Sequence, residues 1–118
     1  MTYQQMVEQI GSMHKTVPTN VYHYFRPQLK APYLVWQEDG SDQFAANNRT
    51  AEMTVSGSTD YFTKTEYDRT VDAIMEMFRA NGFLWQLSSI QYENETGLIH
   101  FEFLWEVYCH GNAEDAGA

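Results

Sequence analysis

Three side chains that can bind metals or transfer protons alternate along residues 98–108: His100, Glu102 and Glu106. Imidazole and carboxylate groups are frequent metal ligands and frequent general acids and bases. Neighbouring side chains on one face of a strand lie about 6.5–7 Å apart, so joint binding of one ion would need a third element. A one-sided antiparallel sheet shows the same alternation. We therefore interpret this face as a solvated or subunit-facing surface, with a small metal-dependent enzyme as the alternative.

Other groupings of reactive residues lack the arrangement that catalysis needs. Cys109 and His110 are adjacent, so they point to opposite faces of a continuing strand, and no orienting third residue accompanies them. The acidic residues of segment 60–72 lack the glycine-punctuated spacing of a calcium loop. The sequence contains no phosphate-binding glycine loop, CxxC pair, HExxH motif or nucleophile elbow. We predict no catalytic residue, no metal ligand and no cofactor.

The strongest structural pattern lies in segment 60–107. A helix is predicted to begin at Thr63, whose side chain would form a capping box with Glu66, and to stop at Asn81-Gly82. Strands are predicted at 83–93 and 98–108, joined as an antiparallel hairpin by the turn at 94–97. The expected buried helix stripe is Tyr67, Val71, Ile74, Met75 and Phe78, and the expected buried face of the last strand is Ile99, Phe101, Phe103, Trp105 and Val107.

The strand at 83–93 contains a change of phase. Trp85 and Leu87 alternate in one phase, whereas Ile90 and Tyr92 alternate in the other. One extra residue in a strand produces this shift, so a β-bulge is predicted at Ser88-Ser89.

The first half of the chain predicts one helix and three strands. Residues 2–15 have the spacing of an amphipathic helix capped by Thr2, which Gly11 would leave short or frayed. Strands are predicted at 21–25, at 33–36 with an end by Asp39 and Gly40, and at 50–61. Residues 40–49 are expected to form a loop, and Gly57 is expected to mark a bulge or a close backbone approach.

The predicted elements follow the order α-β-β-β-α-β-β. This order fits an α+β fold, a mainly antiparallel sheet with two helices packed on one face. With 118 residues, the chain is expected to form a single domain over 1–110, followed by a flexible acidic tail at 111–118.

Composition restricts the function classes. Sixteen acidic and seven basic residues give a net charge of −9, which disfavours binding to nucleic-acid phosphates or to an anionic membrane. The same charge suits a surface past which DNA moves without sticking. A mean hydropathy of −0.51 without a long apolar run excludes a membrane span. One cysteine and no signal-peptide pattern favour a reducing interior such as the cytosol.

Aromatic residues make up 15% of the chain, more than a small core readily holds. Tyr, Trp and Phe are enriched at subunit interfaces, so this content favours an assembly component over an enzyme. A generic small-ligand binding module is a further alternative.

Several stretches carry a resemblance to a known family: PYLVWQE, an Ala-Asn-Asn loop, DYFTKTEYDRTVDAI and YENETGLIHFEFLWEV. They resemble the tail terminators, small tail-completion proteins of tailed phages and prophages. The resemblance spans residues 32–107, and its most specific phrases are DYFTKTE and YENETGLIH.

The resemblance implies a helix-flanked α+β fold and a ring, typically hexameric, at the head-proximal end of the tail tube. Such a ring stops tube polymerisation and joins the tail to the head, without catalysis or a cofactor. The implied partners are further copies of the chain, the tail-tube protein and a neck or head-completion protein. DNA would pass through the ring without specific binding. The implied location is the virion tail or neck, and the host cytoplasm during assembly. Another neck component, such as a stopper or adaptor, is the nearest alternative.

The family has no motif of functional side chains, so the candidate interface residues come from the residue pattern alone. The loop at 40–49 and the polar faces of the strands at 50–61 and 98–108 are the predicted contact surfaces. The candidates are Phe44, Asn47, Asn48, Arg49, Glu52, Thr54, Ser56, His100, Glu102 and Glu106.

Overall fold

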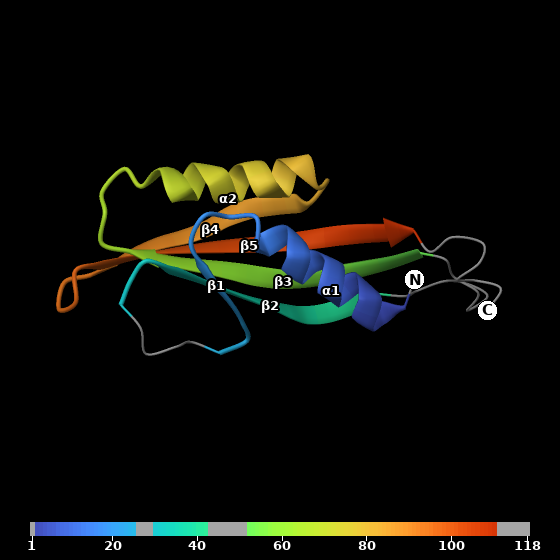
Figure 1. Ribbon diagram of the computed structural model, residues 1–118. Coiled ribbons are helices and arrows are strands. Elements are labelled where there is room, and N and C mark those ends of the chain that lie inside the picture. Colours follow the sequence, from blue (N-terminus) through green and yellow to red (C-terminus); the bar gives the residue numbers. More distant parts are fainter. Residues whose placement is uncertain (1, 26–29, 43–51, 111–118) are drawn as a thin grey trace.

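The computed structural model describes residues 2–25, 30–42 and 52–110, and in this part of the chain two helices lie over one face of a five-stranded sheet (Figure 1). The sheet has the order β1-β2-β3-β5-β4, with β1 parallel to β2 and the other pairs antiparallel. The predicted class and element order are therefore confirmed. The elements are α1 (Tyr3–His14), β1 (Asn20–His23), β2 (Tyr33–Asp42), β3 (Glu52–Thr63), α2 (Arg69–Ala80), β4 (Leu84–Glu93) and β5 (Leu98–His110).

Helix α1 begins as predicted but does not fray at Gly11. Thr2 and Gln5 form a reciprocal capping box at its start. The helix continues through Gly11 to His14, because the glycine lies against the sheet: a Cβ there would approach the Trp36 ring to 2.9 Å. The absent side chain lets helix and sheet come close, and the packing offsets the low helix propensity of glycine.

Helix α2 begins later than predicted, and the Thr63–Glu66 capping box is wrong. Thr63 is the last residue of β3, where it pairs with Ile99, so its backbone is committed to the sheet. The cap is Asp68, which accepts a hydrogen bond from the Thr70 amide at 2.9 Å. Tyr67 precedes the helix with a φ of 57° and is 88% exposed, so it does not belong to the buried stripe.

The strands differ from prediction mainly at their ends. Strand β2 continues past Gly40 to Asp42, because a bulge between Glu38 and Gly40 keeps it paired with β3. Opposite this bulge, the predicted close approach at Gly57 is confirmed: a Cβ there would lie 2.2 Å from the Gln37 carbonyl oxygen. The predicted bulge in β4 is also confirmed, between Leu87 and Ser89.

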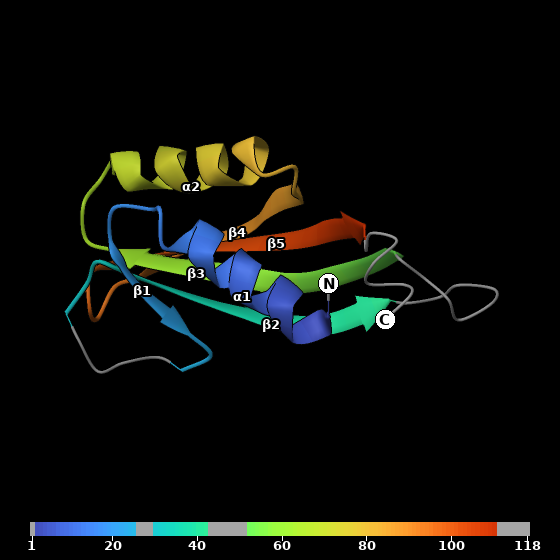
Figure 2. The same cartoon turned by 45° about the vertical axis from the view of Figure 1, so that its right-hand side comes forward.

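Most of the core lies between the helices and the sheet, the two layers that Figure 2 shows from the side. The predicted alternation of β5 is correct, since Phe103, Trp105 and Val107 are buried there, whereas Ile99 and Phe101 at the start of the strand are only half-buried. We call the opposite side of the sheet the open face. One end of that face holds a smaller buried cluster that the sequence pattern did not reveal, Tyr33, Val35 and Phe62, with Tyr22 and Leu98 packed beside it.

Candidate assembly interface

His100, Glu102 and Glu106 lie together on the open face, as predicted, but they do not form one site. The His100 Nε2 atom lies 2.6 Å from the Asp60 Oδ1 atom, and the imidazole stacks on Phe62 with ring centroids 4.3 Å apart. His100 therefore has a carboxylate partner on β3. Within residues 2–25, 30–42 and 52–110, no group of three His, Cys, Asp or Glu side chains could hold a metal ion.

The register across β3 and β5 defines the rest of this surface. Glu102 lies directly opposite Asp60, Glu106 opposite Ser56, and Tyr108 opposite Thr54. Residues opposite each other in an antiparallel pair share a face, so Thr54 and Ser56 join the open face as predicted. Phe44, Asn47, Asn48 and Arg49 lie outside the described residues, as do the Glu52 side chain and the tail at 111–118.

Apolar side chains are exposed beside these carboxylates. On the open face Leu84 is 71% exposed, Tyr108 52% and Leu104 38%. Leu84, Leu104 and Glu106 also line a hollow of about 520 Å³ together with Asp39. The described part of the open face contains no Lys or Arg in the registers of β2 to β5. The surface is thus both acidic and apolar, a composition suited to a partner rather than to water alone.

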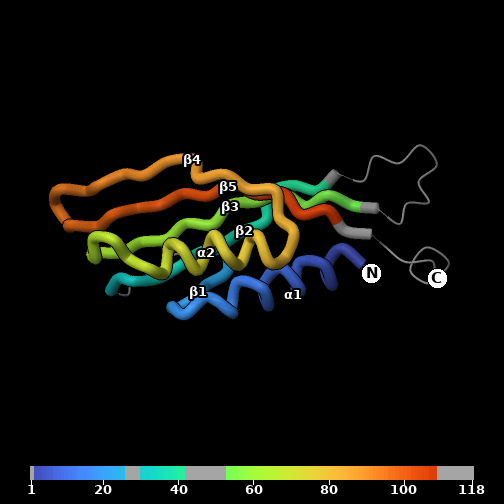
Figure 3. The backbone as a smooth tube through the Cα atoms, turned by 90° about the horizontal axis from the view of Figure 1, so that it is seen from above, coloured from blue at the N-terminus to red at the C-terminus, as the bar shows by residue number. Residues whose placement is uncertain are grey.

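The outer edge of β4 is a second candidate surface, which the list of predicted interface residues missed. Ile90 is 57% exposed and Tyr92 62% exposed, and Leu84 adds a third exposed apolar side chain on the opposite face. In Figure 3 neither helix lies over the half of β4 that leads into the hairpin. In sequence, this edge is marked only by the lack of charged side chains in residues 80–92, a feature that a central strand would show as well.

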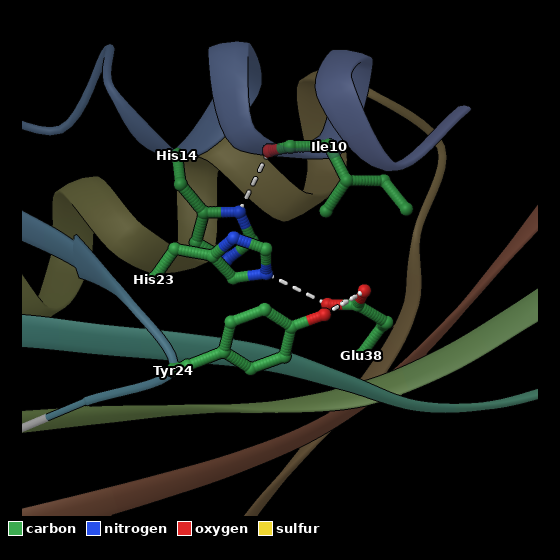
Figure 4. A network of polar contacts seen from close by, with 5 residues as sticks. All are labelled: Ile10, His14, His23, Tyr24 and Glu38. Atoms are coloured by element: carbon green, nitrogen blue, oxygen red, sulfur yellow. Dashed lines mark hydrogen bonds and ion pairs between the residues drawn. The ribbon is translucent and has the colours of Figure 1, made fainter. Parts of the chain in front are cut away.

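A third cluster lies on the helix-covered side, where β1 meets β2 (Figure 4). The Glu38 carboxylate accepts hydrogen bonds from the Tyr24 hydroxyl and from His23 Nε2, the latter at 2.7 Å. Burial opposes ionisation of Glu38, but the bonds from Tyr24 and His23 outweigh it and lower its pKa. The hydrogen bond to Glu38 raises the pKa of Tyr24 to about 12. Each Glu38 oxygen accepts one of these hydrogen bonds, so the cluster anchors the end of β1 to β2.

Deeper under α1, His14 is fully buried in a complete hydrogen-bond chain. His14 Nδ1 lies 2.9 Å from the Ile10 carbonyl, which can only accept, so Nδ1 carries the proton. The Thr59 hydroxyl then donates to Nε2 at 2.7 Å and accepts from Trp105 Nε1 at 2.8 Å. Burial lowers the pKa of His14 to about 4, despite the opposing Ile10 bond. The neutral imidazole is a satisfied core residue.

Comparison with known proteins identifies no family for this chain. No protein-family model and no curated protein matches the sequence. Among the described residues, no helix is long and apolar enough to cross a membrane.

Proposed function

We propose that this protein is a structural assembly component, a tail terminator that forms a ring on the tail tube of a phage and joins it to the neck. The resemblance of segments 32–38, 60–74 and 92–107 to that family supports the proposal, and the observed α+β fold agrees with the fold that the resemblance implies.

The observation that carries the proposal is the composition of the open face. A ring needs an uncovered surface on each copy, and Leu84, Leu104 and Tyr108 offer apolar area for such a contact. Asp60, Glu102 and Glu106 lie among them without a Lys or Arg in the described strands of that face. Carboxylates beside a DNA channel would repel phosphate, so an acidic face also fits a ring through which DNA passes.

Native mass spectrometry of the full chain, alone and after incubation with purified tail tubes, tests the proposal. The wild type should give one closed oligomer larger than a dimer, in isolation or on tubes. Leu104→Glu adds a charge at the centre of the open face, and it should lower the ring fraction at least tenfold because buried like charges repel.

Tyr67→Glu is the matched control, because Tyr67 is an exposed aromatic residue outside the open face. It should assemble like the wild type, and circular dichroism should show that both variants are folded. A strictly monomeric wild type at high concentration, with no ring on assembled tails, would overturn the proposal. Stoichiometric bound metal in the purified protein would instead favour the metal-dependent enzyme.

A further inference from the structure

We propose that β4 pairs antiparallel with β4 of a second copy of this chain, about a two-fold axis at the Ser88-Ser89 bulge. The contact would extend the sheet from five strands to ten across the dimer. A two-fold contact closes at two copies and generates no ring by itself, so this inference is independent of the proposed function.

The residue types of β4 are self-complementary about its centre. Strand β4 reads LWQLSSIQYE, and residues 85–87 mirror residues 90–92 in chemical class, whereas the outermost pair, Leu84 and Glu93, does not match. Counting outward from the two serines pairs an aliphatic residue with an aliphatic one, an amide with an amide and an aromatic ring with an aromatic ring. The mirrored pairs are Leu87 with Ile90, Gln86 with Gln91, and Trp85 with Tyr92.

The bulge brings the mirrored residues onto the same face of the sheet. In a regular strand, Leu87 and Ile90 would point to opposite faces, because side chains alternate with a period of two. Here Leu87 lies opposite Phe103 and Ile90 opposite Phe101, both on the helix-covered face, while Ser89 lies opposite Glu102 between them. Counted along β5, Leu87 and Ile90 thus each lie one residue from the bulge, on opposite sides of it, and their side chains share a face.

The same register holds further out along the strand. Trp85 and Tyr92 lie opposite Trp105 and Ile99 on the helix-covered face. Counted along β5, each lies three residues from the bulge. A two-fold axis through the bulge, perpendicular to the sheet, would therefore place Trp85 beside Tyr92 of the second copy and Leu87 beside its Ile90. Cross-strand aromatic and aliphatic pairs of this kind stabilise sheets.

Exposure on both faces points to an added strand rather than to a partner docked on one face. Ile90 and Tyr92 are exposed on the helix-covered side, whereas Leu84 is exposed on the open face. A partner resting on one face would cover only one of these sets. A strand beside β4 covers both, and it also pairs the backbone groups of this edge, beside which no strand lies among the described residues.

The charge distribution along β4 is compatible with a second copy as the partner. Two chains of net charge −9 repel each other, but β4 carries no charged residue before Glu93. In the proposed register the two Glu93 side chains lie at opposite ends of the contact, about 27 Å apart at 3.4 Å per residue. This separation exceeds the screening length of about 8 Å at physiological salt, so the edge is a place where two copies can meet without strong repulsion.

Disulfide trapping in solution tests the register, with Cys109 replaced by Ser so that each variant has one cysteine. The Gln86→Cys and Gln91→Cys variants should form a covalent dimer when they are mixed under mild oxidation. Opposed residues in an antiparallel pair lie about 4.5–5.5 Å apart between Cα atoms, within disulfide range. Each variant alone should remain monomeric in denaturing electrophoresis. The two copies of the same cysteine would be separated by four residues along the strand, about 14 Å, which is too far for a disulfide.

Dimers from either variant alone, or none from the mixture, would overturn the proposal. Ile90→Lys, introduced into both cysteine variants, should lower the trapped dimer at least tenfold, because a charge would be placed in the apolar pairs. Tyr67→Lys, an equally drastic change away from β4, should not alter the yield. An unchanged yield with Ile90→Lys in a folded protein would also overturn it. Ring assembly is read separately, by oligomer mass, so either proposal can fail alone.

Discussion

The two faces of the sheet are built from alternate residues of the same strands, yet they differ in how far they are buried and in their charge. On the helix-covered face Thr59, Tyr61 and Phe103 are fully buried, and the polar groups of His14 and Trp105 have partners. On the open face Leu104 is 38% exposed, and Asp60 faces Glu102. Strands alone do not produce this difference. One face is closed by α1 and α2 of the same chain, whereas on the other face Leu84 and Leu104 are exposed in the part of the chain that the structure describes.

The largest expected effect breaks the helix-covered face at its tightest point. Gly57→Ala places a Cβ 2.2 Å from the Gln37 carbonyl oxygen and 2.5 Å from the Trp105 ring, so β2 and β3 would have to separate. We expect a loss of about 4 kcal/mol or more in the free energy of unfolding, measured by chemical denaturation. Gly40→Ala is the matched control, because its Cβ would meet only the Ser56 hydroxyl, at 3.1 Å. A loss of the same size at both positions would contradict this account.

The second effect uses pH to probe the same buried layer. Burial lowers the pKa of His14 from 6.5 to about 4, so the unfolded chain binds a proton that the folded chain excludes in this range. Stability should therefore fall as pH falls from about 6.5 to 4, by about 3 kcal/mol from this group. Denaturation of wild type and His14→Gln across this range isolates the contribution, since His23 and His100 are common to both proteins. Parallel curves for the two proteins would refute it.

The smallest effect concerns the open face. Asp60 and Glu102 are directly opposed, and like charges in that position destabilise a sheet. Glu102→Gln should raise the free energy of unfolding by about 0.5 kcal/mol, measured at low and at high salt. High salt should reduce the gain because the repulsion is screened. A substantial loss of stability would mean that Glu102 has a structural partner, and that the two faces are less different than described.

The hairpin of β4 and β5 shows how far local pattern can predict structure. Alternation over residues 98–108 predicted the buried face, and the phase change at Ser88-Ser89 predicted the bulge, because side-chain direction in a strand follows from position alone. Helix α2 shows the limit. Thr63 and Asp68 are both acceptable caps by residue type, and only the pairing of Thr63 with Ile99 decides between them.

The candidate site, too, could be predicted from the sequence only in part. The pattern placed Thr54, Ser56, His100, Glu102 and Glu106 on one surface, and the register confirms that they share the open face. It did not place Asp60 beside His100 or Glu38 between His23 and Tyr24, because these pairs come from segments 14 to 40 residues apart. Contacts between distant segments depend on strand order and register, which no local window contains.

The sequence by itself determined the fold class, the order of the elements, the inward face of β5 and the bulge in β4. Each of these follows from the spacing of apolar residues along a short segment. Only the tertiary structure decided which strands lie at the edges and how far the two helices cover the sheet. Residues 83–92 of the uncharged run read as an ordinary strand in sequence. This strand becomes an exposed edge because β5, rather than β4, is inserted beside β3, which leaves Ile90 and Tyr92 with β5 on one side and no strand on the other side among the described residues.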